Sequence, residues 1–591
     1  MSDPGKASGA FTGRKRAVLA RLIRYLLQIN GWALLLAIIV SVAGNLLALA
    51  GPALSGKAID LIEPGPGAVS IKGVARCCLM MTGCYLLSAA LSYALSLLMI
   101  KISQDAVYHM RRDIFEKLAS LPVGWFDRNQ TGDVLSRVSY DVDTINTSLS
   151  SDIVQIFSSA VTIAGSFVMM LTISPLLSLV FAVTFPLSIL LVRFLTSHTR
   201  PLFRKRSQKY GELNGFVEEM ITGQRTIKAY NREQVTCERF EAFNGAAITA
   251  FCKAEYYGRI TGPTVGFVNN LALSLVGVFG SLLYLAGKLG IGGISSFVLY
   301  SRKFAGPVNE IANIIGDLQS AVSAAERVFR LLDEPSERED SAGAAELDDT
   351  RGNVALEHVD FSYIDGVDVI RDLSLDAPAG SLVAIVGPTG AGKTTIINLL
   401  MRFYDPQSGS VSLDGRPVDT LTRASLRRAY SMVLQDTWLF GGTVYENIAY
   451  GKESATREEV AEACRRAGIA GFIENLPNGY DTVLDEDGGN VSKGQKQLLT
   501  IARAMLIDAK LLILDEATSN VDTRTERRIQ TAMRRIMDGK TCFIIAHRLS
   551  TIRSADVILV VRNGQIVETG THDELMAKRG FYREMFEAQF A

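Results

Sequence analysis

The chain has 591 residues, of which 48% are hydrophobic and 21% are charged. A disordered chain would combine low hydrophobicity with a large net charge, so this composition excludes one. The 61 Lys and Arg residues balance the 61 Asp and Glu residues, and this balance argues against a general electrostatic grip on nucleic acid. Nearly all long apolar runs precede residue 330, so the sequence predicts a membrane half followed by a cytosolic half.

The cysteines do not form a recognisable framework. Their number is odd and no metal-type spacing occurs, so we expect reduced thiols, as in a protein that faces the cytosol. The cysteines are Cys77, Cys78, Cys84, Cys237, Cys252, Cys464 and Cys542. The first 20 residues are polar and then basic, without a short apolar core and a cleavage site, so no cleavable signal peptide is expected.

Six stretches are predicted to cross a membrane, because a span needs about 20 apolar residues. The charge-free run 153–192 has Ser174 and Pro175 near its middle, which indicates two spans joined by a tight turn. The predicted transmembrane domain covers residues 21–331. Its expected spans are 25–56, 77–100, 153–173, 175–195, 260–287 and 289–316.

Lys and Arg residues near the ends of the spans predict the orientation of the chain. Basic residues before the first span place the N-terminal tail, residues 1–20, in the cytosol. Six spans then return the C-terminal half to the same side. The charged regions 101–137 and 193–253 follow the second and fourth spans, so we expect them to be intracellular extensions of the membrane helices.

The sixth predicted span is interrupted by Arg302, Lys303 and Glu310. An ionisable side chain inside a membrane is costly and usually faces a polar cavity or a partner. Arg302 and Lys303 are adjacent, about 100° apart around a helix, so they cannot share one face. Two interpretations stay open for this pair: the side chains snorkel to the cytosolic interface, or they line a cavity. Asn269 and Asn270 in the fifth span raise the same question.

The cytosolic half contains a phosphate-binding loop. Residues 332–352 have the composition of a linker, and the domain that follows covers 353–591. An apolar run, 381–386, leads into the loop and then into a helical pattern. This strand–loop–helix order with G-x-x-x-x-G-K-T is typical of loops whose backbone N–H groups bind phosphate. The loop reads Gly387, Pro388, Thr389, Gly390, Ala391, Gly392, Lys393, Thr394 and Thr395.

Several side chains near this loop predict ATP chemistry. Lys393 is expected to reach the β- and γ-phosphates, and the Thr394 hydroxyl is expected to bind Mg²⁺. A second apolar run, 511–514, ends in Asp515 and Glu516. Asp515 is predicted to hold the metal, directly or through water, and Glu516 to act as the general base.

With these motifs, the second half resembles the nucleotide-binding domain of ABC transporters, and the whole chain resembles an ABC exporter half-transporter. The resemblance implies an α-helical membrane domain with six transmembrane helices and a C-terminal α/β P-loop NTPase domain of the ABC type. It also implies ATP and Mg²⁺ as cofactors. The implied site residues are Tyr363 against adenine, Gly387 to Thr395 as the Walker A loop, Gln435 at the metal, Ser492, Lys493, Gly494 and Gln495 in the signature, Asp515 and Glu516 in Walker B, Asp522 in the D-loop and His547 as the switch histidine.

Two charged segments of the membrane half extend the resemblance. Residues 121–127, with 131–137, resemble the first intracellular loop of these exporters, and 218–230 resemble the second. In the family, such loops carry coupling helices that dock on the ATPase domains. Taken alone, either segment is an ordinary charged helix, and Gln435 and His547 taken alone would more often be structural residues.

Lys493 departs from the family signature, which is usually LSGGQ and reads VSKGQ here. In the family, the signature of one subunit closes over the ATP held by the other, and a side chain at this position intrudes on the close backbone approach. Because Lys393, Glu516 and His547 are all present, the set resembles the catalytically competent subunit of a heterodimeric exporter. We expect a different second half-transporter with an intact signature and a degenerate ATP site. A homodimer that tolerates Lys493 is the alternative.

The expected function is ATP-driven export of a hydrophobic or amphipathic small molecule of the multidrug type, by ATP-induced dimer closure and alternating access. Closure requires that ATP binds the closed state more tightly than the open state. A lipid flippase or peptide exporter is one alternative, and an ATP-gated channel or regulatory module is another. The resemblance favours a multi-pass protein of a bacterial inner membrane with its nucleotide-binding domain in the cytosol. The substrate does not follow from the fold.

Overall fold

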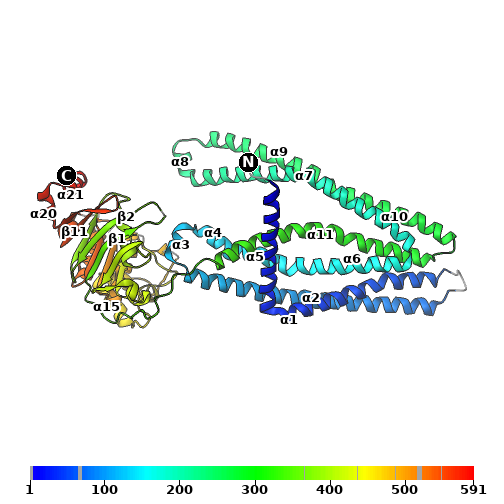
Figure 1. The fold of residues 1–591 in the computed structure, drawn as a ribbon, viewed down its shortest axis with the longest axis horizontal. Coiled ribbons are helices and arrows are strands. Elements are labelled where there is room, and N and C mark those ends of the chain that lie inside the picture. Colours follow the sequence, from blue (N-terminus) through cyan, green and yellow to red (C-terminus); the bar gives the residue numbers. More distant parts are fainter. Residues whose placement is uncertain are drawn as a thin grey trace. The chain divides into compact units, whose positions relative to one another are not determined.

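The computed structural model describes residues 4–63, 69–364, 366–435, 437–485, 488–515, 522–546 and 549–590. The chain divides into two compact units (Figure 1). The first unit contains Met1–Ala119 and Thr131–Glu334, and the second contains Ser120–Gln130 and Pro335–Ala591. A short segment between two helices of the membrane half therefore belongs to the second unit.

Helices form the first unit, and several of them exceed the length of a membrane span. They are α1 (Pro4–Asp60), α2 (Ile71–Ser120), α4 (Thr131–Ser136), α5 (Val142–Thr147), α6 (Ile153–Ile173), α7 (Pro175–Thr222), α8 (Gln224–Ala229), α9 (Glu233–Arg259), α10 (Thr261–Leu285) and α11 (Ile291–Leu332). Between α6 and α7, the Ser174 side chain accepts a hydrogen bond from the Leu177 N–H group at 3.4 Å. Pro175 follows at the first helical position, where its missing N–H group costs no hydrogen bond.

Among the residues that the structure describes, five helical segments are long and apolar enough to cross a membrane. They are Lys15–Asp60, Ile71–Ser120, Thr131–Ile173, Pro175–Thr222 and Glu233–Leu285. The helical membrane domain expected from the sequence is confirmed at this level. The predicted sixth span, 289–316, covers the first part of α11, which is not among the five segments. The count of six spans therefore stays a prediction.

The described part of the second unit contains a six-stranded sheet, a four-stranded sheet and a two-stranded sheet that pairs β7 (Gly442–Thr443) with β8 (Val483–Leu484). The six-stranded sheet has the order β12-β11-β3-β10-β9-β6, with only β12 antiparallel to its neighbour among the described strands. Its strands are β3 (Leu382–Val386), β6 (Tyr430–Val433), β9 (Leu511–Asp515), β10 (Thr541–Ile545), β11 (Val557–Arg562) and β12 (Gln565–Gly570). The antiparallel sheet contains β1 (Val354–Phe361), β2 (Ile370–Ala377), β4 (Ser408–Leu413) and β5 (Arg416–Pro417).

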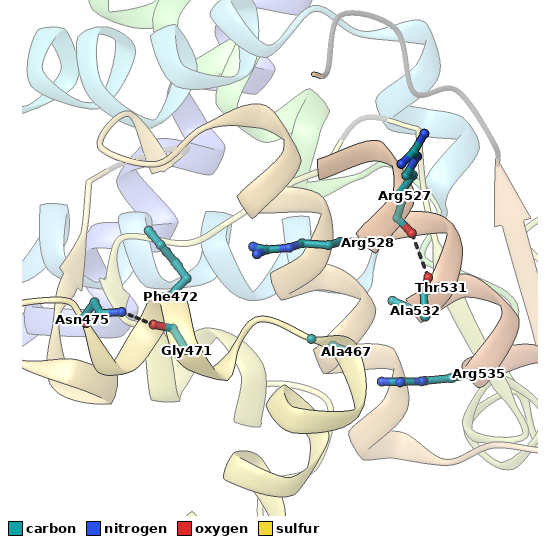
Figure 2. A pocket seen from close by; sticks show the side chains of 10 residues that line it. Ala467, Gly471, Phe472, Asn475, Arg527, Arg528, Thr531, Ala532 and Arg535 are labelled. Carbon is teal, nitrogen blue, oxygen red and sulfur yellow. Dashed lines mark hydrogen bonds between the residues drawn. The ribbon is translucent and has the colours of Figure 1, made fainter. Parts of the chain in front are cut away.

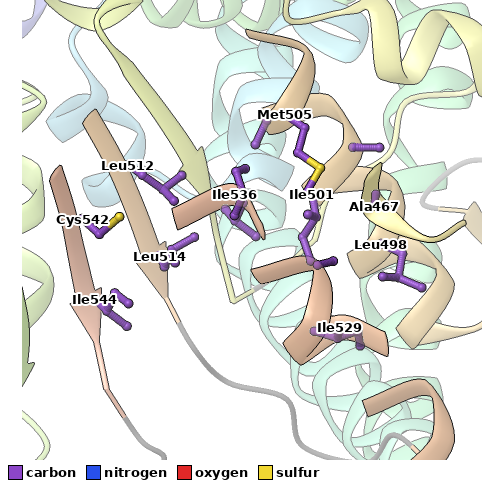
Figure 3. Close-up of a cluster of buried hydrophobic side chains, with 14 of the residues drawn as sticks. Ala467, Leu498, Ile501, Met505, Leu512, Leu514, Ile529, Ile536, Cys542 and Ile544 are labelled. Atoms are coloured by element: carbon purple, nitrogen blue, oxygen red, sulfur yellow. The ribbon is translucent and has the colours of Figure 1, made fainter. Parts of the chain in front are cut away.

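Apolar side chains cover both faces of the six-stranded sheet, as expected for parallel strands buried on both sides. Leu511 and Ile513 of β9 pack toward the antiparallel sheet and α12 (Lys393–Leu400). Leu512 and Leu514 of the same strand pack into the second core, with Ile501 and other side chains from α15 (Arg457–Ala467), α17 (Lys493–Ile507) and α18 (Thr523–Met537) (Figure 3). Because side chains alternate along a strand, one strand contributes to both cores.

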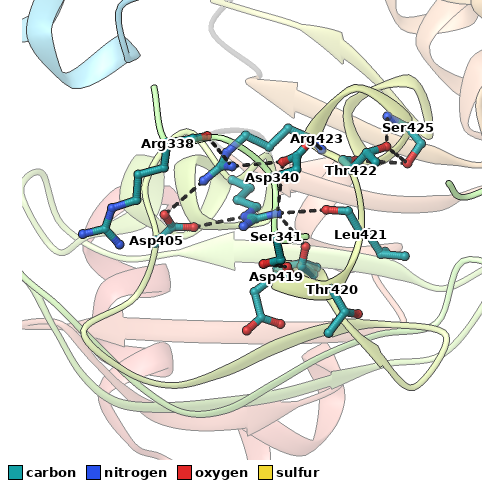
Figure 4. A network of polar contacts seen from close by, with 12 residues as sticks. Arg338, Asp340, Ser341, Asp405, Asp419, Thr420, Leu421, Thr422, Arg423 and Ser425 are labelled. Atoms are coloured by element: carbon teal, nitrogen blue, oxygen red, sulfur yellow. Dashed lines mark hydrogen bonds and ion pairs between the residues drawn. The ribbon is translucent and has the colours of Figure 1, made fainter. Parts of the chain in front are cut away.

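The predicted linker is held on the nucleotide domain by buried arginines (Figure 4). Arg423 begins α13 (Arg423–Arg428) and is only 7% exposed. Its Nη1 donates to Asp340 Oδ1 at 3.0 Å and to the Arg338 carbonyl at 2.8 Å. Its Nη2 donates to Asp405 Oδ2 at 3.2 Å. The segment that joins the two halves is therefore fixed at its C-terminal side, before the first strand of the domain begins.

Replacing Arg423 with alanine is expected to lower the free energy of unfolding of the nucleotide domain by about 2–3 kcal/mol. The substitution removes one of the two buried arginines that contact Asp340 and Asp405, and Arg402 stays 3.0 Å from Asp405 and 3.9 Å from Asp340. Breaking a fully buried pair costs several kcal/mol, and the loss is reduced here because Arg402 remains and both acids are partly exposed. Urea unfolding of the full-length chain measures the change. Arg428→Ala is the matched control, because Arg428 is 71% exposed and lies 3.9 Å from Glu346. Equal losses in the two variants would contradict the anchoring role of Arg423.

Candidate functional site

Four parallel strands bring the candidate site residues to one edge of the six-stranded sheet. The Cα partners near this edge are Ile385 with Ile545, Ile545 with Asp515, and Leu514 with Val433. The phosphate loop follows β3, Asp515 ends β9, and Gln435 follows β6. In open α/β sheets, ligands bind outside the carboxyl ends of parallel strands at such a point. The strand order therefore brings together residues as far apart in the chain as Gly387 and Asp515.

Two predicted catalytic residues, Glu516 and His547, lie outside the described residues. In the sequence, Glu516 directly follows Asp515, the last residue of β9, and His547 follows Ala546, which comes after β10. Their roles as general base and switch histidine stay predictions.

The phosphate loop has a backbone that only glycine adopts readily. Gly390 has φ +80° and Gly392 has φ +105°. A Cβ atom at Gly392 would lie 2.8 Å from Ile370 Cδ1, so a side chain there would also clash. Gly392 is the N-cap of α12, whose first-turn N–H groups have no intrahelical partners. The loop and the helix end therefore present N–H donors and a positive dipole to an anion such as a nucleotide phosphate.

Lys393 lies over this loop. Its Nζ donates to the Gly387 carbonyl at 2.8 Å and to the Pro388 carbonyl at 3.0 Å. Burial lowers the pKa of Lys393, and the nearby Asp515 carboxylate opposes that shift. The ammonium group is thus already at the loop, half-buried, and close to the carboxylate that ends β9.

The predicted metal-binding side chains fit a metal that arrives with a nucleotide. Thr394, Gln435 and Asp515 stand at the ends of three different elements at the same sheet edge, and Thr394 and Gln435 are exposed. In the described part of the chain, no group of three or more His, Cys, Asp or Glu side chains could hold a metal ion by itself. Phosphate oxygens would complete the ligand set, as is usual for Mg²⁺.

Tyr363 connects the phosphate-loop helix to an aromatic cluster. Its hydroxyl donates to Thr395 Oγ1 at 3.2 Å and accepts from Asn398 Nδ2 at 3.1 Å. The ring is 40% exposed, which leaves a face for an adenine base. Its edge-to-face neighbour is Tyr404, with ring centroids 4.9 Å apart.

Tyr404 in turn holds the segment of the membrane half that joins this unit. Its hydroxyl donates to Asp127 Oδ2 at 2.6 Å, and Asp127 belongs to α3 (Val123–Arg128). Burial, and then this hydrogen bond, raise the pKa of Tyr404. Gly124 packs so closely on the ring that an added Cβ atom would lie 2.7 Å from it. The first predicted coupling helix is therefore linked through one tyrosine to the ring expected to stack on adenine.

The predicted signature forms the start of α17. Ser492 is the N-cap: its Oγ accepts from the Gln495 N–H group at 3.3 Å, and Gln495 Oε1 accepts from the Ser492 N–H group at 2.8 Å. This capping box fixes the end of the helix. Lys493 is the first helical residue and is exposed, whereas Gly494 is buried. No hydrogen bond between described residues joins 492–495 to the phosphate loop.

Asp522, predicted as a D-loop residue, is the N-cap of α18. Its carboxylate accepts from the N–H groups of Arg524 at 3.1 Å and Thr525 at 2.9 Å. These backbone hydrogen bonds, the one from Thr525 first, lower the pKa of Asp522. The carboxylate therefore stabilises the helix, in addition to any contact with a nucleotide.

Sequence reasoning missed Arg503, which ties α17 to the segment after Gln435. Its Nε donates to the Asn447 carbonyl at 2.7 Å, and its Nη1 donates to the Trp438 carbonyl at 3.2 Å. The guanidinium also lies over the Phe440 and Tyr450 rings, 5.9 and 5.6 Å from their centroids. An arginine within an otherwise apolar stretch of helix was the available signal. Tyr404 and Asn398 were missed as well, and their ordinary sequence surroundings gave no signal.

A hollow of about 730 Å³ lies elsewhere in the second unit (Figure 2). It is lined by Ala467, Gly468, Gly471, Phe472, Asn475, Arg527, Arg528, Thr531, Ala532 and Arg535. Arg535 Nη1 donates to the Arg466 carbonyl at 3.0 Å, near the C-terminal end of α15. None of the predicted site residues lines this hollow, and its arginines are exposed, so we do not assign it to the nucleotide site.

Comparisons with known proteins match both halves of the chain. A family model described as the ABC transporter transmembrane region matches residues 34–308, and one described as ABC transporter matches residues 370–519. An ABC transporter ATP-binding protein of Bacillus subtilis, YfiC, is 42% identical over 97% of this chain and 94% of its own length.

Other relatives carry names that mention a substrate. A fatty acid ABC transporter ATP-binding/permease protein of Mycobacterium tuberculosis is 45% identical over 89% of this chain and 83% of its own length. An ATP-dependent lipid A-core flippase of Salmonella typhimurium is 35% identical over 87% and 88% of the two chains. Among solved structures, a bacterial Atm1-family ABC exporter with ATP bound has a TM-score of 0.78 at 30% identity, covering 95% of this chain and 99% of that one.

Proposed function

The chain belongs to the ABC transporter family, as a half-transporter that fuses a transmembrane domain to an ATP-binding domain, and we propose that it exports an amphipathic molecule with an acyl-like apolar part. Transport coupled to ATP hydrolysis follows from the exporter homology. The class of substrate is inferred from the relatives. This class of substrate is supported by the similarity to relatives named for fatty acid transport and for flipping lipid A-core.

The observation that carries the ATPase part is the meeting of the phosphate loop, Asp515 and Gln435 at one sheet edge. In the proposed complex, Tyr363 stacks on adenine, and the loop N–H groups with Lys393 hold the phosphates. Mg²⁺ held by Thr394, Gln435 and Asp515 would neutralise charge on the phosphates.

The remaining steps belong to residues of the chain that lie outside the described part. Glu516 orients and deprotonates the attacking water, and His547 contacts the γ-phosphate. α3 contacts Tyr404 of the nucleotide domain, and in the sequence α3 lies between two helices of the membrane half. A movement of the nucleotide domain can therefore be transmitted to the membrane half through α3.

Half-transporters of this family dimerise, and we propose that the second subunit is a different chain. Lys493 has an ordinary helical φ, so the position does not demand glycine for conformational reasons. The long, exposed side chain is what would interfere with close approach to a nucleotide held by the other subunit. Every residue of α8, in the second predicted coupling segment, is at least partly exposed, which leaves that helix available for docking.

The experiment is ATPase activity of the purified chain in lipid, with its oligomeric mass, alone and co-expressed with a second half-transporter that has an intact signature. We expect the chain alone to be slow, and the pair to turn over at least about ten times faster, since one competent site needs one intact signature. Lys493→Gly should raise the activity of the chain alone. A stable homodimer with brisk turnover that Lys493→Gly leaves unchanged would contradict the heterodimer.

The proposed location is a bacterial inner membrane, with the nucleotide-binding domain in the cytosol. The five candidate spans and the bacterial relatives support it. The arrangement would place both coupling segments and the phosphate loop on the side where ATP is available.

A further inference from the structure

Hydrogen bonds fix α11 along the apolar part of α1. The Gly292 N–H group donates to Asp60 Oδ1 at 2.7 Å, and Ser296 Oγ donates to the Pro52 carbonyl at 2.9 Å. Further along, the Tyr300 hydroxyl donates to the Leu49 carbonyl at 2.6 Å. The first part of α11 therefore runs antiparallel to a helix segment that is a candidate span.

This register gives the depth of the two cations in α11. Arg302 is ten residues from Gly292, or about 15 Å along the helix axis at 1.5 Å per residue. The hydrocarbon core of a bilayer is about 30 Å thick. Asp60 marks the outer end of α1, and the facing residue Ala48 lies within the charge-free run 25–56. If α11 crosses the bilayer beside α1, as the predicted sixth span requires, Arg302 lies near the middle of the core.

The two adjacent cations have different surroundings, which the sequence could not separate. Lys303 Nζ donates to the Ala48 carbonyl at 3.0 Å, so it is bound between α11 and α1. Arg302 is exposed, and it makes no hydrogen bond or ion pair with any other residue in the described part of the chain. Neither side chain fits the interpretation in which both snorkel to the cytosolic interface.

Arg302 belongs to an open face of α11. Ser295, Leu299 and Gly306 lie on the same side of the helix at 100° per residue, and all are at least partly exposed. The opposite side is buried: Phe304 packs against aromatic rings of α7, with its centroid 5.2 Å from that of Phe185. A guanidinium on the open face cannot be left in hydrocarbon, so this face must meet water, a ligand or another subunit.

We propose that Arg302 binds the anionic headgroup of the transported amphiphile, so that the substrate class is an amphiphile with a carboxylate or phosphate group. This inference rests on the proposed export function, and it adds that the transporter selects substrates with a negatively charged headgroup. A planar guanidinium donates two parallel hydrogen bonds to either group, and such charge-assisted pairs are strong where water is scarce. Leu299, partly exposed on the same face one turn away, offers an apolar contact for the tail.

The test compares probes that share a tail and differ in the headgroup: dodecanoate, dodecyl phosphate, dodecanol and dodecylamine. Each probe competes with a spin-labelled fatty acid for the full-length transporter in lipid nanodiscs. The ratio of the dissociation constants gives the contribution of the headgroup to binding, and no transport is required. We expect wild type to bind at least one anion about tenfold or more tightly than dodecanol. Which anion binds more tightly identifies the headgroup.

Variants separate Arg302 from its neighbour. Arg302→Gln should weaken binding of the preferred anion about tenfold and leave dodecanol unchanged, because a hydrogen bond to a charged group is lost. Arg302→Lys should recover most of the preference. Lys303→Gln is the matched control: it removes an adjacent cation that already has a partner, so it should shift anion and alcohol equally. Retained ATP binding shows that each variant is folded.

Two results would overturn the inference. One is equal binding of anion and alcohol by wild type, and the other is an unchanged preference in Arg302→Gln, as expected if Arg302 instead pairs with an acid of the second subunit. Failure of the proposed function looks different. In that case Arg302→Gln still weakens anion binding, but ATP drives no movement of any of the four probes.

Discussion

Replacing Glu516 with glutamine is expected to lower ATP turnover at least about 100-fold while leaving the affinity for ATP close to that of wild type. A positioned general base contributes about 10²–10⁴-fold, and the amide cannot accept the proton of the attacking water. The shape of the side chain and the adjacent Asp515 are kept, so binding of the nucleotide and its metal should persist. The variant should therefore accumulate in the ATP-bound, closed state.

Two measurements on the same preparation check this expectation: steady-state phosphate release, and ATP-dependent association of the nucleotide domains followed by cross-linking. Glu458→Gln is a suitable control, because that carboxylate lies in the first turn of α15, away from the strand edge that holds Asp515. Glu516→Gln turning over like wild type would show that another group activates the water.

Replacing Lys393 with methionine should act on the earlier step and weaken ATP binding about 100-fold. The ammonium lies at the loop, where it donates to the Gly387 and Pro388 carbonyls. From this position it is expected to donate hydrogen bonds to the phosphate oxygens of bound ATP. Two charge-assisted hydrogen bonds at about 1.5 kcal/mol each would account for this factor. Methionine keeps the apolar stem and removes only the charge.

Binding of a fluorescent ATP analogue measures this loss. Lys452→Met is the matched control, since its Nζ pairs with Glu459 on the surface at 2.7 Å. If Lys393→Met bound ATP as wild type does and lost only turnover, Lys393 would act in the transition state and not in the ground state. The contrast between Lys393→Met and Glu516→Gln thus separates binding from hydrolysis.

Local patterns predicted most of what lies within one stretch of the chain. A strand, a glycine-rich loop and a helix adjoin in sequence, so the loop from Gly387 to Thr395 is recognisable from the order of its residues alone. The same holds for the apolar strand that ends in Asp515. The membrane half and the ABC-type nucleotide domain were also predicted, and the comparisons confirm them.

Contacts between distant residues were not predictable in this way. Tyr404 and Asp127 are 277 positions apart, and neither has a distinctive neighbourhood in the sequence. The different surroundings of Arg302 and Lys303 depend on which face of α11 meets α1, and one sequence with two adjacent cations does not specify that face. The composition of 332–352 suggested a linker, whereas buried Arg423 holds part of it on the domain, because the ion pairs come from residues about 80 positions later.

We propose above that this half-transporter moves an amphiphile outward with ATP. Uptake of a fluorescent fatty acid into inside-out vesicles that contain the transporter, with its second subunit where needed, tests the claim most directly. We predict accumulation above the equilibrium level that requires ATP and disappears in Glu516→Gln. Equilibration that stops at equal concentrations would indicate a channel, and brisk ATP hydrolysis without any uptake would indicate a regulatory module; either result would contradict export.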